Sequence, residues 1–238
     1  MDPPLMTLQL LGTFAFAADG QTRQVGPALQ RLLAFLAVHS WPSRHVIASM
    51  LWPDHPEDAA LAALRTTVWR LQHHTPQVLD VGVHTLALSR HVRVDLHECL
   101  AWSHRVLRQA DLVPDHELEP PSPTADLLPG WFDDWLEPER QRLHQLHLHA
   151  LETAAEEQLR RGAPGPALAT AFTALCADPL RESAHRLVVR IHLAEGNVDA
   201  ALRQYSACRD ALSRELGVQP SAALVDLVVP YLSRPSSL

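Results

Sequence analysis

The sequence contains no lysine, and it also lacks any long apolar run. Every permanently positive side chain is therefore an arginine, a group suited to bidentate contacts with phosphate or guanine. Genome base composition is the simpler explanation of this bias. Because no stretch of about 18 consecutive apolar residues occurs, we expect no membrane span and no membrane partner. The net charge of −7 argues against a strongly basic nucleic-acid binder.

Cysteines are few, and Cys99, Cys176 and Cys208 have neither CxxC nor Cys/His finger spacing. We interpret all three as reduced, small hydrophobic side chains. The segment Met1–Leu11 carries no basic residue before its short apolar run, so a secretory signal is not expected. Together these features predict a cytoplasmic protein.

Signatures of catalysis are also missing from the sequence. No Ser/His/Asp or Cys/His arrangement has a local signature, and no phosphate-binding GxxxxGK[ST] loop is present. His144 and His147 are three residues apart and share a helix face, but no carboxylate or cysteine completes a metal site at a known spacing. We therefore expect no enzyme activity, no cofactor and no bound metal.

Residues 1–97 predict a small domain of strands and helices. An apolar run over 7–16 predicts a strand, which ends before a turn at Asp19-Gly20. Three helices, the second with Ser43 as its N-cap, and two short strands around Gly82 are predicted over 28–39, 45–51, 57–74, 78–81 and 85–88. Strands, three helices and a final hairpin are the order of a winged helix-turn-helix.

The predicted helix over 57–74 has two different faces. Apolar residues at spacings of three and four form one stripe, which consists of Leu61, Leu64, Val68 and Leu71. The opposite face carries Ala62, Thr66, Trp69, Arg70 and His73. A helix of this kind can bury the first face in its own domain and place the second in the major groove of DNA.

Residues 98–238 predict an all-helical domain. A loop with five prolines over 114–129 interrupts it, and glycine or proline breaks separate the later helices. Gly162 and Gly196 lie 34 residues apart, which is the period of tetratricopeptide (TPR) helix pairs. The predicted fold class is thus mainly α: a winged helix-turn-helix with small β-sheets, followed by an all-α TPR-like helical-repeat domain.

Two groups of residues near the start of the long helical part are interpreted from their types. The apolar group is interpreted as core of the helical domain and consists of Trp131, Trp135, Leu143 and Leu146. The acidic group is interpreted as a solvated face at a helix start, where it suits the helix dipole, and consists of Asp133, Asp134, Glu137 and Glu139.

Three stretches of the second domain resemble the bacterial transcriptional activator domain of the SARP family: LPGWFDDW at 128–135, DPLRESAHRL at 178–187 and RELGVQPS at 214–221. In the first domain, ALRTTVWRL at 63–71 is similar to the recognition helix of the family's OmpR-like DNA-binding domain. The resemblance implies a transcription regulator of activator type. Its implied partners are double-stranded promoter DNA, read in a sequence-specific way by a homodimer on direct repeats, and RNA polymerase.

Combined with the outer helix face and the wing, the resemblance gives the candidate DNA-contacting residues, which are Arg65, Thr66, Trp69, Arg70, His73 and His84. Arg70 lies centrally on the face and suits a base edge or a phosphate; the other interpretation is a solvated helix arginine. For Arg65, a phosphate contact and an ion pair with Glu57 or Asp58 remain open.

The side chains of Thr66 and Trp69 also allow two interpretations each. Thr66 suits a thymine methyl group or a phosphate, or is an ordinary surface residue without a binding role. Trp69 wedges against the DNA backbone or, as we favour, packs against the wing or a neighbouring domain.

The chain departs from the family pattern in two places. Further basic residues are common after the recognition Arg-Leu pair, but here these positions are Gln72, His73 and His74. The predicted wing turn, Gly82-Val83-His84, also lacks arginine. Both departures remove phosphate contacts. They favour the alternative that the chain is a protein-interaction module whose winged helix has lost most of its DNA affinity.

Overall fold

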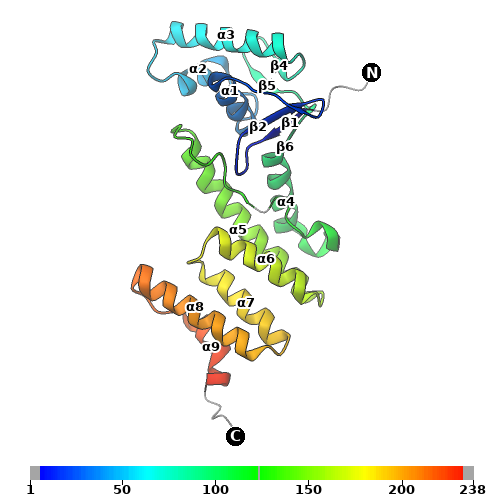
Figure 1. Ribbon diagram of the computed structural model, residues 1–238, viewed down its shortest axis with the longest axis vertical. Coiled ribbons are helices and arrows are strands. Elements are labelled where there is room, and N and C mark those ends of the chain that lie inside the picture. Colours follow the sequence, from blue (N-terminus) through cyan, green and yellow to red (C-terminus); the bar gives the residue numbers. More distant parts are fainter. Residues whose placement is uncertain (1–5, 123, 233–238) are drawn as a thin grey trace. The chain divides into compact units, whose positions relative to one another are not determined.

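The computed structural model describes residues 6–122 and 124–232, and contacts divide the chain into two compact units (Figure 1). The first unit consists of the chain up to Leu100 together with 125–144. The second unit consists of 101–124 together with the chain from Gln145 onward. The two sequence-predicted domains, 1–97 and 98–238, differ from these units because 125–144 packs with the first.

A four-stranded sheet opens the first unit. Its strands are β1 (Met6–Gln9), β2 (Ala15–Ala18), β3 (Gln21–Thr22) and β6 (Val92–Val94), in the order β3-β2-β1-β6. β1 is antiparallel to β2 and parallel to β6. The prediction of one strand over 7–16 is wrong, because the chain reverses around Gly12, whose φ is 79°. Reversal pairs Leu8 with Phe16, so that both side chains are buried on one face of the sheet.

The predicted helices and hairpin of the first unit are confirmed to within two residues at each end. They are α1 (Pro27–Val38), α2 (Arg44–Leu51), α3 (Glu57–His74), β4 (Leu79–Val81) and β5 (Leu86–Leu88). The hydroxyl of Ser43 accepts a hydrogen bond from the Val46 amide at 3.3 Å, as expected of an N-cap. The turn at Asp19-Gly20 is also confirmed, since both residues have positive φ.

Residues 125–144 complete the first unit. Leu127 forms an isolated bridge with Leu11, and the Leu128 amide donates to the Leu10 carbonyl at 2.9 Å. Trp135 packs edge-on to Phe35 with ring centroids 5.1 Å apart. The interpretation of Trp131, Trp135 and Leu143 as core of the helical domain is therefore wrong: these residues pack with the core of the winged-helix unit, and Leu146 is half-buried.

Two polar contacts hold the same segment in place. Asp133 was expected to be a solvated helix-start residue, but its carboxylate binds the guanidinium of Arg31 at 2.5 Å and is largely buried. Arg140 donates to the carbonyls of Leu127 and Trp131, both at 2.8 Å, and to that of Leu128. A single charged side chain thus donates to three carbonyls of a non-helical stretch, of which that of Leu128 also accepts from the Trp131 amide.

The remaining elements are helical. They are α4 (Asp95–Gln109), the short 3₁₀ turns η1 (Ala110–Leu112) and η2 (Asp115–Glu117), α5 (Leu136–Arg160), α6 (Pro164–Ala177), α7 (Glu182–Ala194), α8 (Val198–Leu216) and α9 (Ala222–Leu232). The helix breaks lie where the sequence predicts them, and Gly162 and Gly196 both have a φ of 77°. The expected repeat of helix pairs is therefore present. No helix among the described residues is long and apolar enough to cross a membrane.

The structure bears on two sequence-based interpretations of the second domain, those of its proline-rich loop and of its cysteines. The proline-rich loop over 114–129 was expected to lie wholly inside it, but the residues from Ala125 onward pack with the first unit. Among the three cysteines interpreted as small hydrophobic side chains, Cys176 is exposed, whereas Cys99 and Cys208 are buried. None of these three described residues forms a disulfide.

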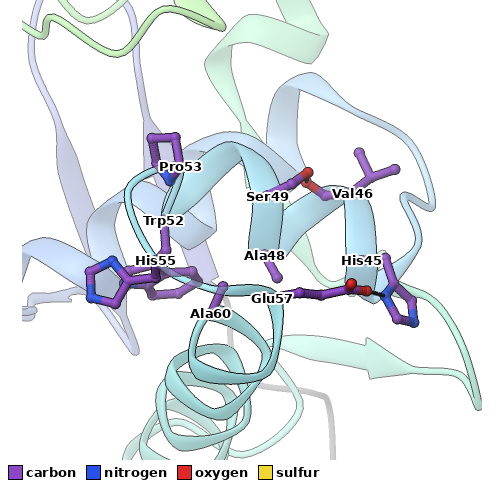
Figure 2. Close-up of a pocket in the computed structure, with 9 residues that line it drawn as sticks. All are labelled: His45, Val46, Ala48, Ser49, Trp52, Pro53, His55, Glu57 and Ala60. Carbon is purple, nitrogen blue, oxygen red and sulfur yellow. Dashed lines mark hydrogen bonds and ion pairs between the residues drawn. The ribbon is translucent and has the colours of Figure 1, made fainter.

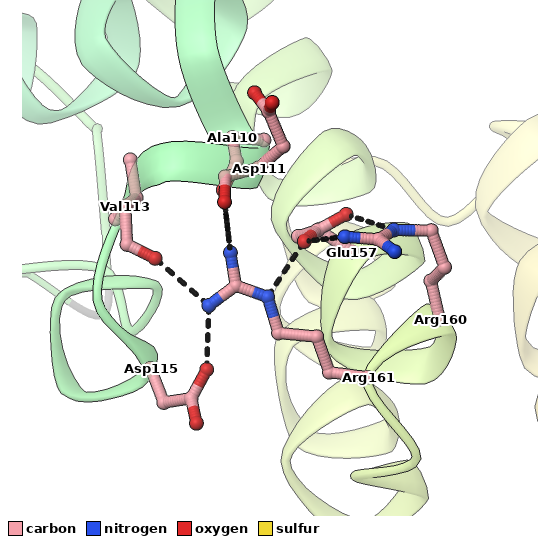
Figure 3. Close-up of polar contacts among 7 residues, drawn as sticks. All are labelled: Ala110, Asp111, Val113, Asp115, Glu157, Arg160 and Arg161. Atoms are coloured by element: carbon pink, nitrogen blue, oxygen red, sulfur yellow. Dashed lines mark hydrogen bonds and ion pairs between the residues drawn. The ribbon is translucent and has the colours of Figure 1, made fainter.

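Arg161 fixes the loop that follows α4 within the second unit (Figure 3). Its guanidinium donates to the carbonyls of Ala110 and Val113, both at 2.8 Å, and binds Asp115 at 2.5 Å. Glu157 accepts from Arg160 and Arg161 at 2.5 and 2.6 Å. The hydrogen bond from Arg160, with a further one from Arg161 and against the opposing effect of burial, lowers the pKa of Glu157 to about 2.

Candidate nucleic-acid interface

The inner face of α3 anchors the helix in the first unit. Its buried residues are Ala60, Leu64, Thr67, Val68 and Leu71. Three of the four residues of the predicted apolar stripe are therefore buried, and Leu61 is half-buried. Thr67 is tolerated in this core because its hydroxyl donates to the Ala63 carbonyl at 2.8 Å.

The outer face of α3 is a continuous exposed stripe. Its members follow each other at helical spacings of three and one, and they are Ala62, Arg65, Thr66, Trp69, Arg70 and His73. Five of the six predicted DNA-contacting residues thus lie on one solvent-facing surface of one helix. His84, the sixth, is exposed at the turn between β4 and β5.

The arginines of this face are free to bind a ligand. Among the described residues, neither Arg65 nor Arg70 forms an ion pair or a hydrogen bond through its side chain. The possible partner of Arg65, Glu57, binds His45 at 2.8 Å instead. The ion-pair interpretation of Arg65 is therefore wrong in this structure, and the outer face carries two uncompensated positive charges.

Trp69 is largely exposed and is not buried against the wing, one of the two packing partners favoured from the sequence. Its side chain is 63% exposed, and its ring lies against that of His73, with centroids 5.2 Å apart and an interplanar angle of 15°. Thr66 donates its hydroxyl hydrogen to the Ala62 carbonyl at 3.0 Å. This bond leaves the Thr66 hydroxyl without a hydrogen for a phosphate and leaves its methyl group for apolar contact.

Arg44 supplies the positive charge that the wing turn lacks, and sequence reasoning missed it. Its guanidinium lies 3.5 Å from the Gly82 carbonyl, and its amide donates to the His84 carbonyl at 2.9 Å. An isolated bridge between Ser43 and Thr85 joins the same two segments. The only sequence signal was a basic residue beside a helix N-cap, because the contact joins residues about 40 positions apart.

A groove between α2 and α3 lies beside this surface (Figure 2). The ion pair between His45 and Glu57 closes one end, and Trp52 and His55 lie at the other. Both members of the ion pair are well exposed, so it contributes little to stability. The pair joins the first residues of α2 to the first turn of α3, whose orientation is set by its buried face.

Histidines do not assemble into a metal centre in the part of the chain that the structure describes, where no group of three or more potential ligands is found. His147, which the sequence placed beside His144 on one helix face, is buried and contacts Trp102, with ring centroids 5.7 Å apart. It therefore belongs to the packing of the second unit.

Comparisons with known proteins agree with this architecture. Residues 123–228 match the family described as the bacterial transcriptional activator domain. The chain is 29% identical over 237 residues to the regulatory protein AfsR of Streptomyces coelicolor, a match that covers 92% of this chain and 23% of AfsR. Its fold is similar to that of Mycobacterium tuberculosis EmbR, solved in complex with a low-affinity phosphopeptide, with a TM-score of 0.71 and 20% identity over 95% of this chain and 64% of the EmbR chain.

A winged helix with an exposed recognition helix, combined with an activator domain of paired helices, defines a class of bacterial transcription regulators. The chain is similar to SARP-type regulators of this class, and residues 123–228 match the activator domain that the motifs at 128–135, 178–187 and 214–221 indicated. The predicted fold class is confirmed as well. The chain spans less than two thirds of the length of either relative.

Proposed function

We propose that this regulator binds double-stranded DNA in a sequence-specific way, with α3 in the major groove and the β4–β5 turn against the neighbouring backbone. The observation that carries the proposal is the pair of uncompensated arginines, Arg65 and Arg70, on the exposed face of a helix whose other face is buried. Exposed guanidinium groups without protein partners suit phosphate oxygens and the acceptor edge of guanine.

The roles of the residues follow from their positions. Arg70 lies in the middle of the stripe and is assigned to a base edge, while Arg65 and Arg44 are assigned to phosphates. His84 at the wing turn and His73 near the end of α3 contribute further polar contacts. Two phosphate contacts predict that affinity falls roughly 12-fold when the salt concentration rises from about 50 to about 200 mM.

The helical second domain, 98–238, is proposed to mediate homodimerisation on direct repeats and contact with RNA polymerase. Support comes from the match to the bacterial transcriptional activator domain and from the helix pairs, which in repeat proteins expose surfaces that bind other proteins. In vitro transcription from a selected site, with and without the protein, tests the polymerase contact. Sedimentation of the protein–DNA complex gives the number of chains per site.

The DNA proposal is tested by selecting fragments of the source genome with the full chain, followed by fluorescence anisotropy on the enriched duplex at two salt concentrations. Arg70→Ala should weaken binding by about 1–3 kcal/mol, because a base contact is lost. The matched control is Arg203→Ala, which removes the same charge from an exposed ion pair on α8. Equal binding by wild type and the Arg70 variant would show that α3 does not read the DNA.

A second candidate function is a protein-interaction module with little DNA affinity. The observation that favours it is the wing turn, Gly82-Val83-His84, which contains no arginine and in which Val83 is 85% exposed. This candidate predicts that selection enriches no DNA fragment, and that binding of any duplex shows no sequence preference.

A further inference from the structure

Trp69 stands apart from the other residues on the outer face of α3. It is the only large apolar side chain that the described residues of this helix expose, at 63% of its surface. Its neighbours along the stripe are arginines and small or polar residues. An exposed indole amid charged groups is costly to solvate, so a ligand that covers it gains a favourable contribution to its binding free energy.

The indole is held in a defined orientation. His73 lies one turn further along the helix, and the two rings are stacked at 5.2 Å with a 15° angle between their planes. Trp has only two side-chain torsions, and stacking against His73 restricts both. One face of the indole is thereby covered, while the rest of the ring projects into solvent on the same side as Arg70.

The residues that precede Trp69 leave room for close approach and add apolar surface. Ala62 is short, and Thr66 has committed its hydroxyl hydrogen to the helix backbone. In the major groove, the apolar group that a base-pair edge presents is the C5-methyl group of thymine; the other edge groups are hydrogen-bond donors and acceptors. An oriented apolar ring beside a base-reading arginine therefore matches one base in particular.

We infer that Trp69 is a specificity-determining residue that reads thymine through contact of its indole with the C5-methyl group. This inference rests on the proposed DNA-binding function and adds a base identity to it. Arg70 and Trp69 both belong to the exposed stripe of α3, so both contacts are made from the same face of the helix. His73 acts through Trp69 as a positioning residue.

The test uses the full-length chain and a duplex selected from random DNA. Each thymine of the bound site is replaced, one at a time, by deoxyuridine, which removes only the C5-methyl group. At one position or a few, this change should weaken binding of the wild-type protein about fourfold, the value for one buried methyl group. The same replacement should have no effect on Trp69→Ala, and a reduced effect on Trp69→Phe.

Three further variants make the result specific. Phe132→Ala removes an aromatic ring that is 94% exposed in the same unit but lies outside α3, and it should keep the full uracil penalty. His73→Ala should reduce the penalty and His73→Phe should restore it, because phenylalanine can stack on Trp69 but cannot bind a phosphate. A direct phosphate contact by His73 would give no such rescue.

The outcomes separate this inference from the proposed function. If the wild type binds its selected duplex with steep salt dependence but tolerates uracil at every position, DNA binding stands and the thymine contact is refuted; Trp69 then meets the sugar-phosphate backbone or a protein surface. A uracil penalty that persists in Trp69→Ala also refutes it. If the wild type enriches no DNA, the proposed function fails and the thymine contact fails with it.

Discussion

Replacing Arg140 with alanine tests whether residues 125–144 are an integral part of the winged-helix unit. The side chain donates to the carbonyls of Leu127, Leu128 and Trp131 and is 23% exposed. A hydrogen bond to a charged group contributes about 1.5–3 kcal/mol, and a buried carbonyl left without a donor costs about 1–3 kcal/mol. Since water can reach part of the vacated space, we expect the first unit to lose about 2–4 kcal/mol of unfolding free energy.

Two measurements together locate the effect of Arg140→Ala. Urea denaturation gives the loss of unfolding free energy. Hydrogen exchange at the amides of Gly12 and Leu128 reports on the pairing of 125–144 with the first strands, because these amides donate to the Asp126 and Leu10 carbonyls. Both amides should exchange faster in the variant, while amides of α7 in the second unit should be unaffected.

Arg142→Ala is the matched control for Arg140→Ala. Arg142 lies on the same helix and forms an exposed ion pair with Glu139 at 2.9 Å, so its loss should cost less than about 1 kcal/mol. Similar losses for the two variants, or unchanged exchange at Gly12 and Leu128 in Arg140→Ala, would refute the structural role given to Arg140.

Two further predictions concern stability. The folded-state pKa of Glu157 is about 2 against an ordinary value of 4.5, so its contribution to stability is present above pH 4.5 and is lost as the pH falls toward 2. Glu157→Gln should therefore flatten a plot of urea midpoint against pH between pH 4.5 and 2. An unchanged slope in this pH range would contradict the prediction. A fragment of residues 1–97 lacks the segment that covers Phe35 and Phe14; it should bind a hydrophobic dye and unfold at lower urea than the whole chain, and identical midpoints would count against the prediction.

The local structure of the winged helix was readable from the sequence. The periodicity of Leu64, Val68 and Leu71, together with the break at Pro76, defined α3 at both ends, and Ser43 marked the start of α2. These signals are local, since helix caps, proline and the 3.6-residue period act within a few positions. The glycines at the helix breaks predicted the helix pairs of the second domain from equally local signals.

The candidate site was predicted in part. The outer face of α3 follows from the same periodicity, so Arg65, Thr66, Trp69, Arg70 and His73 could be grouped from the sequence. The sequence could not predict whether an arginine on that face is free or forms an ion pair. Glu57 had two possible partners, and only the packed structure shows that it binds His45. The position of Arg44 beside the wing turn likewise depends on the bridge between Ser43 and Thr85.

What the sequence by itself determined is the order, the boundaries and the two-faced character of the helices, together with the motifs of the family. What only the tertiary structure decided is which unit a segment joins. Trp131, Trp135 and Asp133 look like the start of the helical part. They nevertheless contact Phe35 and Arg31 of α1 and Phe14, which precedes β2. An apolar side chain does not by itself specify its packing partner, because the hydrophobic effect is non-directional. Composition therefore predicts that a tryptophan will be buried but not against which core.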